Sequence, residues 1–199
     1  TITRPIIIKY KQKKRKMRRS IGRSRGEGLK NNISFKWVNK INEMDIKLIA
    51  ANLEDLDTIL QMQKEAFTEL YEKYQDTETS PATENYEDIL FRFNQPETTY
   101  YFITADNIKV GVIRVVDFKD GITRKRISPI FIMPEYRNNG YAQQAIKEAE
   151  RIHGKHHWKL DTILQEKGNC YLYEKLGYHK TGKTEIINDK MTIVFYEKD

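Results

Sequence analysis

Arg137 and Gly140 are two residues whose types and spacing suit phosphate binding. A guanidinium pairs with a phosphate through two donors, and a glycine lets the backbone approach a bulky anion. The two residues stand between an apolar, β-branched run at 127–132, which Pro134 ends, and a helical pattern that begins near Gly140. The first N–H groups of a helix lack internal partners, and the helix dipole adds positive potential there. The stretch therefore predicts an anion site suited to a pyrophosphate.

A simpler interpretation of the same stretch is that Gly140 only closes a turn between a strand and a helix. The stretch is not a Walker loop, because no Gly-Lys-Ser or Gly-Lys-Thr follows, and it lacks the three glycines of a dinucleotide-binding turn. Both interpretations stay open on this stretch alone.

A second stretch, 169–178, reads Asn-Cys-Tyr-Leu-Tyr-Glu-Lys-Leu-Gly-Tyr. Asn169 and Tyr173 are four residues apart, so a helix would place them on one face, beside an apolar stripe that contains Leu172 and Leu176. One face can then pack while the other meets a ligand. The plainer interpretation of Tyr173 is a half-buried core tyrosine.

The pair Arg-x-x-Gly-x-Ala at 137–142 and Asn-x-x-x-Tyr-Glu-Lys-Leu-Gly-Tyr at 169–178 resembles the GNAT superfamily of acyl-CoA-dependent N-acyltransferases. The resemblance covers about residues 44–199. It implies acetyl-CoA as co-substrate, with its pyrophosphate at the first motif and Tyr173 as proton donor to the departing sulfur. A phenol of pKa ~10 stays protonated at neutral pH and can protonate a thiolate whose conjugate acid has a pKa of ~8.5. The residues that the resemblance assigns to acetyl-CoA are Ile132, Met133, Arg137, Asn138, Asn139, Gly140, Tyr141, Ala142 and Asn169; Ala142 stands where the family often has a second glycine.

The mechanism implied is direct attack of an amine on the thioester, without a covalent enzyme intermediate. Backbone N–H groups near Ile132 and Met133, at a strand end splayed from its neighbour, would bind the pantetheine arm and polarise the carbonyl. The sequence does not rank the candidates for the general base, which are Asp117, Glu135, Asp161 and Glu84. It does not identify the amine either, although the acidic balance of residues 44–199 favours a cationic acceptor.

The expected fold is α/β, a mixed and mostly antiparallel sheet flanked by helices, with a parallel pair around the CoA site. Alternation, turn residues and caps place strands at 45–50, 99–105, 109–118, 124–132, 158–164 and 190–197. Helical spacing places helices from Asn52 to about Tyr74 and at 86–93, 141–153 and 168–176. A polar loop with Pro81 spans 75–84, where GNAT proteins shape the acceptor pocket.

Cysteine and histidine usage bounds the chemistry further. The single cysteine, Cys170, excludes an internal disulfide and is expected to be a small buried residue. The four histidines show no metal-ligand spacing, so no metal is expected. No apolar run approaches the ~20 residues that span a bilayer. We expect a cytoplasmic protein, monomer or homodimer.

The basic charge is concentrated in residues 1–43. They carry 14 Lys and Arg against two acidic residues, whereas 44–199 carry 21 against 26. Such a segment is expected to be disordered. One hypothesis is an arm that binds nucleic acid or an anionic membrane surface, with a GNAT-like module that holds CoA without turnover as the alternative function. The favoured hypothesis is a leader outside the working protein, since Met44 looks like a natural start.

Overall fold

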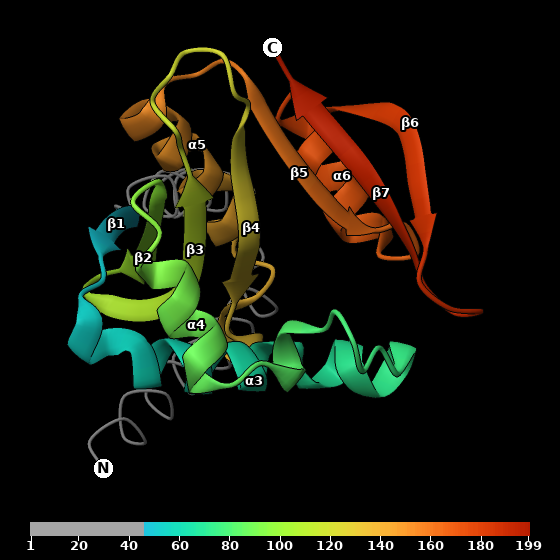
Figure 1. Ribbon diagram of the computed structural model, residues 1–199, viewed down its shortest axis with the longest axis horizontal. Helices are drawn as coiled ribbons and strands as arrows, with labels where there is room; N and C mark the ends of the chain where they lie inside the picture. The colour runs from blue at the N-terminus through green and yellow to red at the C-terminus, as the bar shows by residue number, and fades with distance from the viewer. Residues whose placement is uncertain (1–45) are drawn as a thin grey trace, which may run out of the picture. The chain divides into compact units, whose positions relative to one another are not determined.

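The computed structural model describes residues 46–199, and the predictions made for the basic segment 1–43 lie outside them. The described residues form a seven-stranded sheet in the order β1-β2-β3-β4-β5-β7-β6 (Figure 1). The strands are β1 (Ile46–Ala50), β2 (Thr98–Ala105), β3 (Ile108–Val116), β4 (Lys125–Ile132), β5 (Trp158–Ile163), β6 (His179–Ile186) and β7 (Thr192–Lys198). Every neighbouring pair is antiparallel except β4 and β5. The predicted fold class is thereby confirmed.

Four α-helices flank this sheet within residues 46–199: α3 (Leu56–Tyr74), α4 (Tyr86–Phe93), α5 (Tyr141–His153) and α6 (Lys167–Lys175). Short 3₁₀ turns lie at Leu53–Asp55, Pro81–Thr83 and Pro134–Tyr136. Asn52 caps the first turn as predicted, and Asn85 caps α4 in the same way. The β2–β3 hairpin turns through Asp106 and Asn107, whose φ values of 50° and 63° suit such residues in a tight turn.

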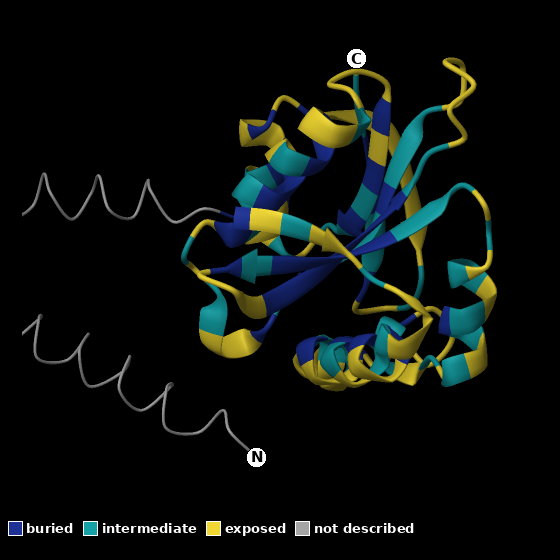
Figure 2. Cartoon of the chain, turned by 90° about the vertical axis from the view of Figure 1, so that its left-hand side faces the viewer, coloured by how far each residue is buried: buried dark blue, intermediate teal, exposed yellow. Residues whose placement is uncertain are grey.

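The helices sit in layers on the two faces of the sheet. The helices α3 and α4 pack on one face through a core that includes Leu56, Ile59, Ile89, Tyr100, Phe102 and Val112. The helix α5 packs against β1 to β4, and α6 packs against β5. Figure 2 shows buried residues along the central strands and exposed residues along the outer sides of the helices. Each helix thus presents an apolar stripe to the sheet.

The strand β6 was not predicted, and its burial explains why. It is an edge strand paired only with β7, and all its residues are exposed. A strand with no buried face carries no alternation of apolar and polar residues, so the sequence offers no periodic signal. The predicted closing strand at 190–197 corresponds to β7, which begins at Thr192.

Two further features of residues 46–199 bear on function. None of the helices in this part of the chain combines the length and the apolar character needed to cross a bilayer. The same residues hold no group of three or more His, Cys, Asp and Glu side chains arranged to bind a metal ion.

Candidate functional site

The parallel strands β4 and β5 separate soon after they pair. Only Lys125 with Trp158 and Arg126 with Lys159 are in register, whereas β4 continues to Ile132. Figure 1 shows the two strands diverging toward α3. A cavity of about 470 Å³ lies along this opening, with walls from α3, the α3–α4 loop, α4, β3, β4, β5, α6 and the β6–β7 hairpin. This volume is in the range of small-molecule sites.

The backbone of β4 offers one of its two expected amides to this opening. The Met133 N–H donates to the Val110 carbonyl at 2.9 Å, so it belongs to the ladder with β3. Bonded and non-bonded pairs alternate in an antiparallel ladder, so Ile132, opposite Gly111, turns its N–H away from β3. The neighbour on that side is β5, which does not pair with β4 beyond Arg126. Of the two expected residues, Ile132 is therefore the one whose amide turns away from β3, although the wall of the cavity includes β4 only from Arg126 to Ile130.

The loop from β4 into α5 has the features of an anion site. Gly140 is the N-cap of α5 with φ 77°, and Asn138 has φ 62°, both in the left-handed region. No side chain caps α5 and no acidic residue lies in its first turn, which contains Tyr141 and Ala142. A Cβ at Gly140 would meet only Gln144 Nε2, at 3.9 Å, so the space beside the helix end is open. These residues fit a pyrophosphate.

The side chain of Arg137 turns onto α3. Its Nη1 lies 2.8 Å from Glu69, its Nη2 donates to the Ala66 carbonyl at 2.7 Å, and its Nε donates to the Ile132 carbonyl at 3.3 Å. Asn139 donates to two carbonyls within the loop. Arg137 thus ties the loop to α3, and its pairing with a phosphate stays a prediction.

Tyr173 lies on α6 at the wall of the cavity and is 6% exposed. Its ring meets the rings of Tyr178 and Tyr196 at centroid distances of 6.3 and 6.0 Å. Burial, with smaller contributions from Asp161 and Cys170, raises the pKa of Tyr173 well above its ordinary value. The phenol therefore stays protonated at neutral pH, as a proton donor requires.

Asn169 stands one turn before Tyr173 on α6, as their spacing predicted, and both line the cavity. Its Nδ2 lies 3.5 Å from Thr162 Oγ1 on β5. The neighbouring Cys170 is buried, also as expected. The helix α6 therefore presents an amide and a phenol to the opening while its thiol packs inside.

Two of the four carboxylates expected as general bases line the cavity. Glu84 lies 2.6 Å from Arg92 Nη1, and Asp161 lies 2.7 Å from Arg126 Nη2. Each is therefore held by an arginine rather than unpaired. The two candidates that do not line this cavity are Asp117 and Glu135.

The sequence prediction missed three arginines of the cavity wall, Arg92, Arg114 and Arg126. The sequence does hold a signal for Arg114, because it interrupts the apolar run Val-Ile-Arg-Val-Val of β3 and is itself 9% exposed. Burial of a charged side chain in the middle of a strand costs free energy unless the charge is paired, so such a residue is a candidate for a functional role.

A second missed feature is a partly buried network around His153, the last residue of α5. Its Nδ1 lies 2.9 Å from Asp117 Oδ2, and its Nε2 lies 2.9 Å from the Tyr101 hydroxyl oxygen. The ring also meets Trp158 edge-on at 6.3 Å. None of these residues lines the cavity, so the network joins α5 to the sheet.

Comparisons with known proteins agree with this geometry. The model of the acetyltransferase (GNAT) family matches residues 56–178. No curated protein matches the chain.

Solved structures with a similar fold include three acetyltransferases. A spermidine N-acetyltransferase from Vibrio cholerae, in complex with CoA and spermine, has TM-score 0.60 and 17% identity over 76% of this chain and 94% of its own. The microcin C7 self-immunity acetyltransferase MccE, in complex with acetyl-CoA and AMP, has TM-score 0.60 and 15% identity, over 80% of this chain and 94% of its own. The PaiA N-acetyltransferase of Thermoplasma acidophilum, with CoA, has TM-score 0.56 and 16% identity over 77% and 99%. At these identities the likeness concerns the fold, whereas the match to the family model covers more than half of the sequence; the chain belongs to the GNAT family of acetyltransferases.

Proposed function

We propose that the domain transfers an acetyl group from acetyl-CoA to the amine of an acceptor by direct attack. The observation that carries this proposal is the position of Tyr173, buried at the opening between β4 and β5, where burial raises the pKa of its phenol. Family membership supports the reaction class, and solved GNAT structures with acetyl-CoA or CoA support the co-substrate.

The residues that would hold acetyl-CoA follow the strand and the helix. The uncapped N-terminus of α5, with Gly140 as its N-cap, suits the pyrophosphate because its N–H groups have no competing side chain. The Ile132 N–H faces the gap beside β5 and suits the pantetheine arm. Asn169 lines the same cavity beside Tyr173.

The proposed reaction needs no covalent intermediate with the protein. The bound thioester supplies an electrophilic carbonyl carbon. The neutral amine nitrogen forms a bond to that carbon, the carbon–sulfur bond breaks, and the nitrogen loses a proton to water. Tyr173 gives its proton to the departing sulfur and regains one from solvent, which avoids releasing a free thiolate.

Thiol release from acetyl-CoA across a library of amines tests this proposal, with the acetylated amine identified by its mass. We expect release that depends on both the enzyme and a particular amine. A domain that binds CoA with no acetylated product from any amine would contradict the proposal. Spermidine belongs in the library because similar structures are spermidine N-acetyltransferases.

A further inference from the structure

Three guanidinium groups converge on the wall of the cavity. Arg92 comes from the last turn of α4, Arg114 from β3 and Arg126 from β4. The β3–β4 register shifts between Ile113 and Val115, opposite the stretch that includes Ser128. A bulge of this kind changes the direction of nearby side chains, and here Arg114 of β3 and Arg126 of β4 both reach the same cavity.

The charges of this group do not cancel. Arg92 pairs with Glu84 at 2.6 Å and Arg126 with Asp161 at 2.7 Å. Arg114 has no carboxylate partner among residues 46–199, and its Nε donates to the Ser128 carbonyl. Burial is the largest cause that lowers the pKa of the Arg114 guanidinium; Tyr100 acts in the opposite direction, the charges of Arg92 and Arg126 lower the pKa further, and Glu84 raises it.

A buried hydroxyl beside these arginines lacks an acceptor for its proton. Tyr100 is 1% exposed, and its hydroxyl oxygen lies near the Arg92 guanidinium, which can only donate, so no group in the described part of the chain accepts the Tyr100 O–H. It lies opposite Arg114 in the β2–β3 ladder, with the Arg114 Cζ 6.0 Å from its ring centroid. Burial raises the pKa of Tyr100, so its hydroxyl keeps a proton to donate. An orphaned buried donor of this kind needs an explanation.

The two remaining carboxylates of the cavity wall, Asp76 and Glu185, form no ion pair with Arg114. Asp76 is 4% exposed and accepts the N–H groups of Glu78 and Thr79 and the Thr79 hydroxyl, within its own loop. Glu185 is an exposed residue of β6. Holding the Ser128 carbonyl needs only a neutral donor, so a purely structural role leaves the buried charge unexplained.

We propose that the acceptor is a small amine that also carries an oxyanion, a carboxylate or a phosphate, and that Arg114 binds this oxyanion. An oxyanion at this place would form an ion pair with the Arg114 guanidinium. It could also accept a hydrogen bond from the Tyr100 hydroxyl. The proposal rests on the proposed function and narrows its substrate class. It departs from the cationic acceptor that the acidic balance of the domain favoured, because a buried guanidinium without a carboxylate partner would act on the acceptor at shorter range than the surface charge does.

Calorimetric titration tests the proposal without turnover, on the full chain saturated with CoA. The probes are β-alanine, 4-aminobutanoate and O-phosphoethanolamine, each compared with its uncharged counterpart, β-alaninamide, 4-aminobutanamide or ethanolamine, and with spermidine. We expect at least one anionic probe to bind about tenfold or more tightly than its counterpart. The carboxylate and phosphate arms show which oxyanion fits.

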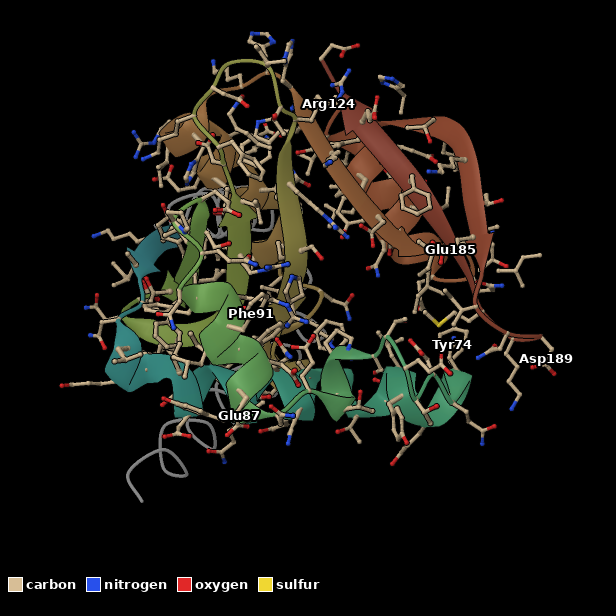
Figure 3. The ribbon with its side chains drawn as sticks, viewed as in Figure 1. Tyr74, Glu87, Phe91, Arg124, Glu185 and Asp189 are labelled. Carbon is tan, nitrogen blue, oxygen red and sulfur yellow. The ribbon has the colours of Figure 1, made fainter. Side chains whose placement is uncertain are left out.

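Arg114→Gln should remove this preference, and Arg114→Lys should retain only part of it, because an ammonium lacks the planar fork. Arg124→Gln is the matched control: Arg124 pairs with Glu197 and Asp199, and Figure 3 shows it well away from Tyr74 and Glu185, which line the cavity. The control should keep the full preference.

Equal binding of charged and uncharged probes to the wild-type protein, tighter binding of spermidine, or no binding of any anionic probe would overturn the proposal. So would a preference that survives Arg114→Gln. The wild-type comparison stands even if Arg114→Gln does not fold. Charge-selective binding with no thiol release from acetyl-CoA would contradict the proposed reaction and leave the anion site supported; thiol release with spermidine alone would do the reverse.

Discussion

The Asp117 Oδ2 lies 2.9 Å from the His153 Nδ1, and this contact joins the residue that follows β3 to the last residue of α5. Both side chains are nearly buried, with 11% and 9% exposed. Burial by itself would raise the pKa of Asp117, but the hydrogen bonds from His153 and the Lys119 N–H outweigh it, and the pKa lies below its ordinary value.

This contact predicts an acid-sensitive contribution to stability. A carboxyl whose folded pKa is depressed stabilises fully above its unfolded pKa of ~3.9, and the contribution is lost as the pH falls through the folded pKa. Asp117→Asn should therefore lower the free energy of unfolding by about 1–3 kcal/mol at pH 7, and the difference from the wild type should shrink below about pH 4. Denaturant unfolding at a series of pH values measures both.

The control for that experiment is Asp106→Asn. Asp106 is exposed in the β2–β3 turn at φ 50°, a conformation that asparagine also adopts. Its substitution should be close to neutral at every pH. A cost for Asp117→Asn that stays constant down to pH 2.5 would show that the carboxyl acts by packing instead.

Acetyl-CoA should raise the melting temperature, because a ligand that binds only the folded state stabilises it by mass action. Gly140→Asp should remove most of this shift by placing a carboxylate at the N-terminus of α5. Gly140→Asn is the matched control, since it imposes a similar left-handed strain without the charge. Thermal melts of the three proteins at equal acetyl-CoA give the answer; equal shifts in both variants would place the pyrophosphate elsewhere.

The local parts of the fold were predictable because their signals are local. Asn52 and Asn85 cap helices through contacts within three residues, and Asp106 and Asn107 turn a hairpin between adjacent strands. The strand β6 carried no signal, because an exposed edge is specified by its pairing with β7 rather than by its own pattern.

The site was predictable only in part for a related reason. Gly140 and Tyr173 stand in stretches whose spacing can be read along the chain. The meeting of Arg92, Arg114 and Arg126 at one cavity depends on strand register and helix packing, which bring together positions far apart in sequence. The Met133 N–H donates to the Val110 carbonyl because of the register between β3 and β4. This register cannot be read from the sequence alone.

Tyr173→Phe should reduce kcat for thiol release by about 10²-fold or more while the affinity for acetyl-CoA stays unchanged, the range for loss of a general acid. The ring contacts with Tyr178 and Tyr196 survive this change, so folding should be intact. Tyr171→Phe is the control on the same helix, because Tyr171 is 67% exposed and should be silent. Near-full activity of Tyr173→Phe would mean that water or another group protonates the sulfur.

The last prediction concerns residues 1–43. Residues 45–199 form a compact unit by themselves, and the sheet of this unit begins at Ile46, which is 8% exposed and pairs with Ala105. A chain that starts at Met44 should therefore fold, show the same acetyl-CoA shift and release thiol as the full chain does.

A chain that starts at Leu53 is the control: it lacks β1 and should melt at a lower temperature, because β2 loses its partner and the core loses Ile46. Any retention of nucleic acid by the full chain should vanish in the shorter one and should weaken steeply with salt beforehand, as contacts to phosphates do. If the Met44 chain instead loses activity while keeping its melting temperature, residues 1–43 take part in the reaction, and the leader hypothesis is wrong.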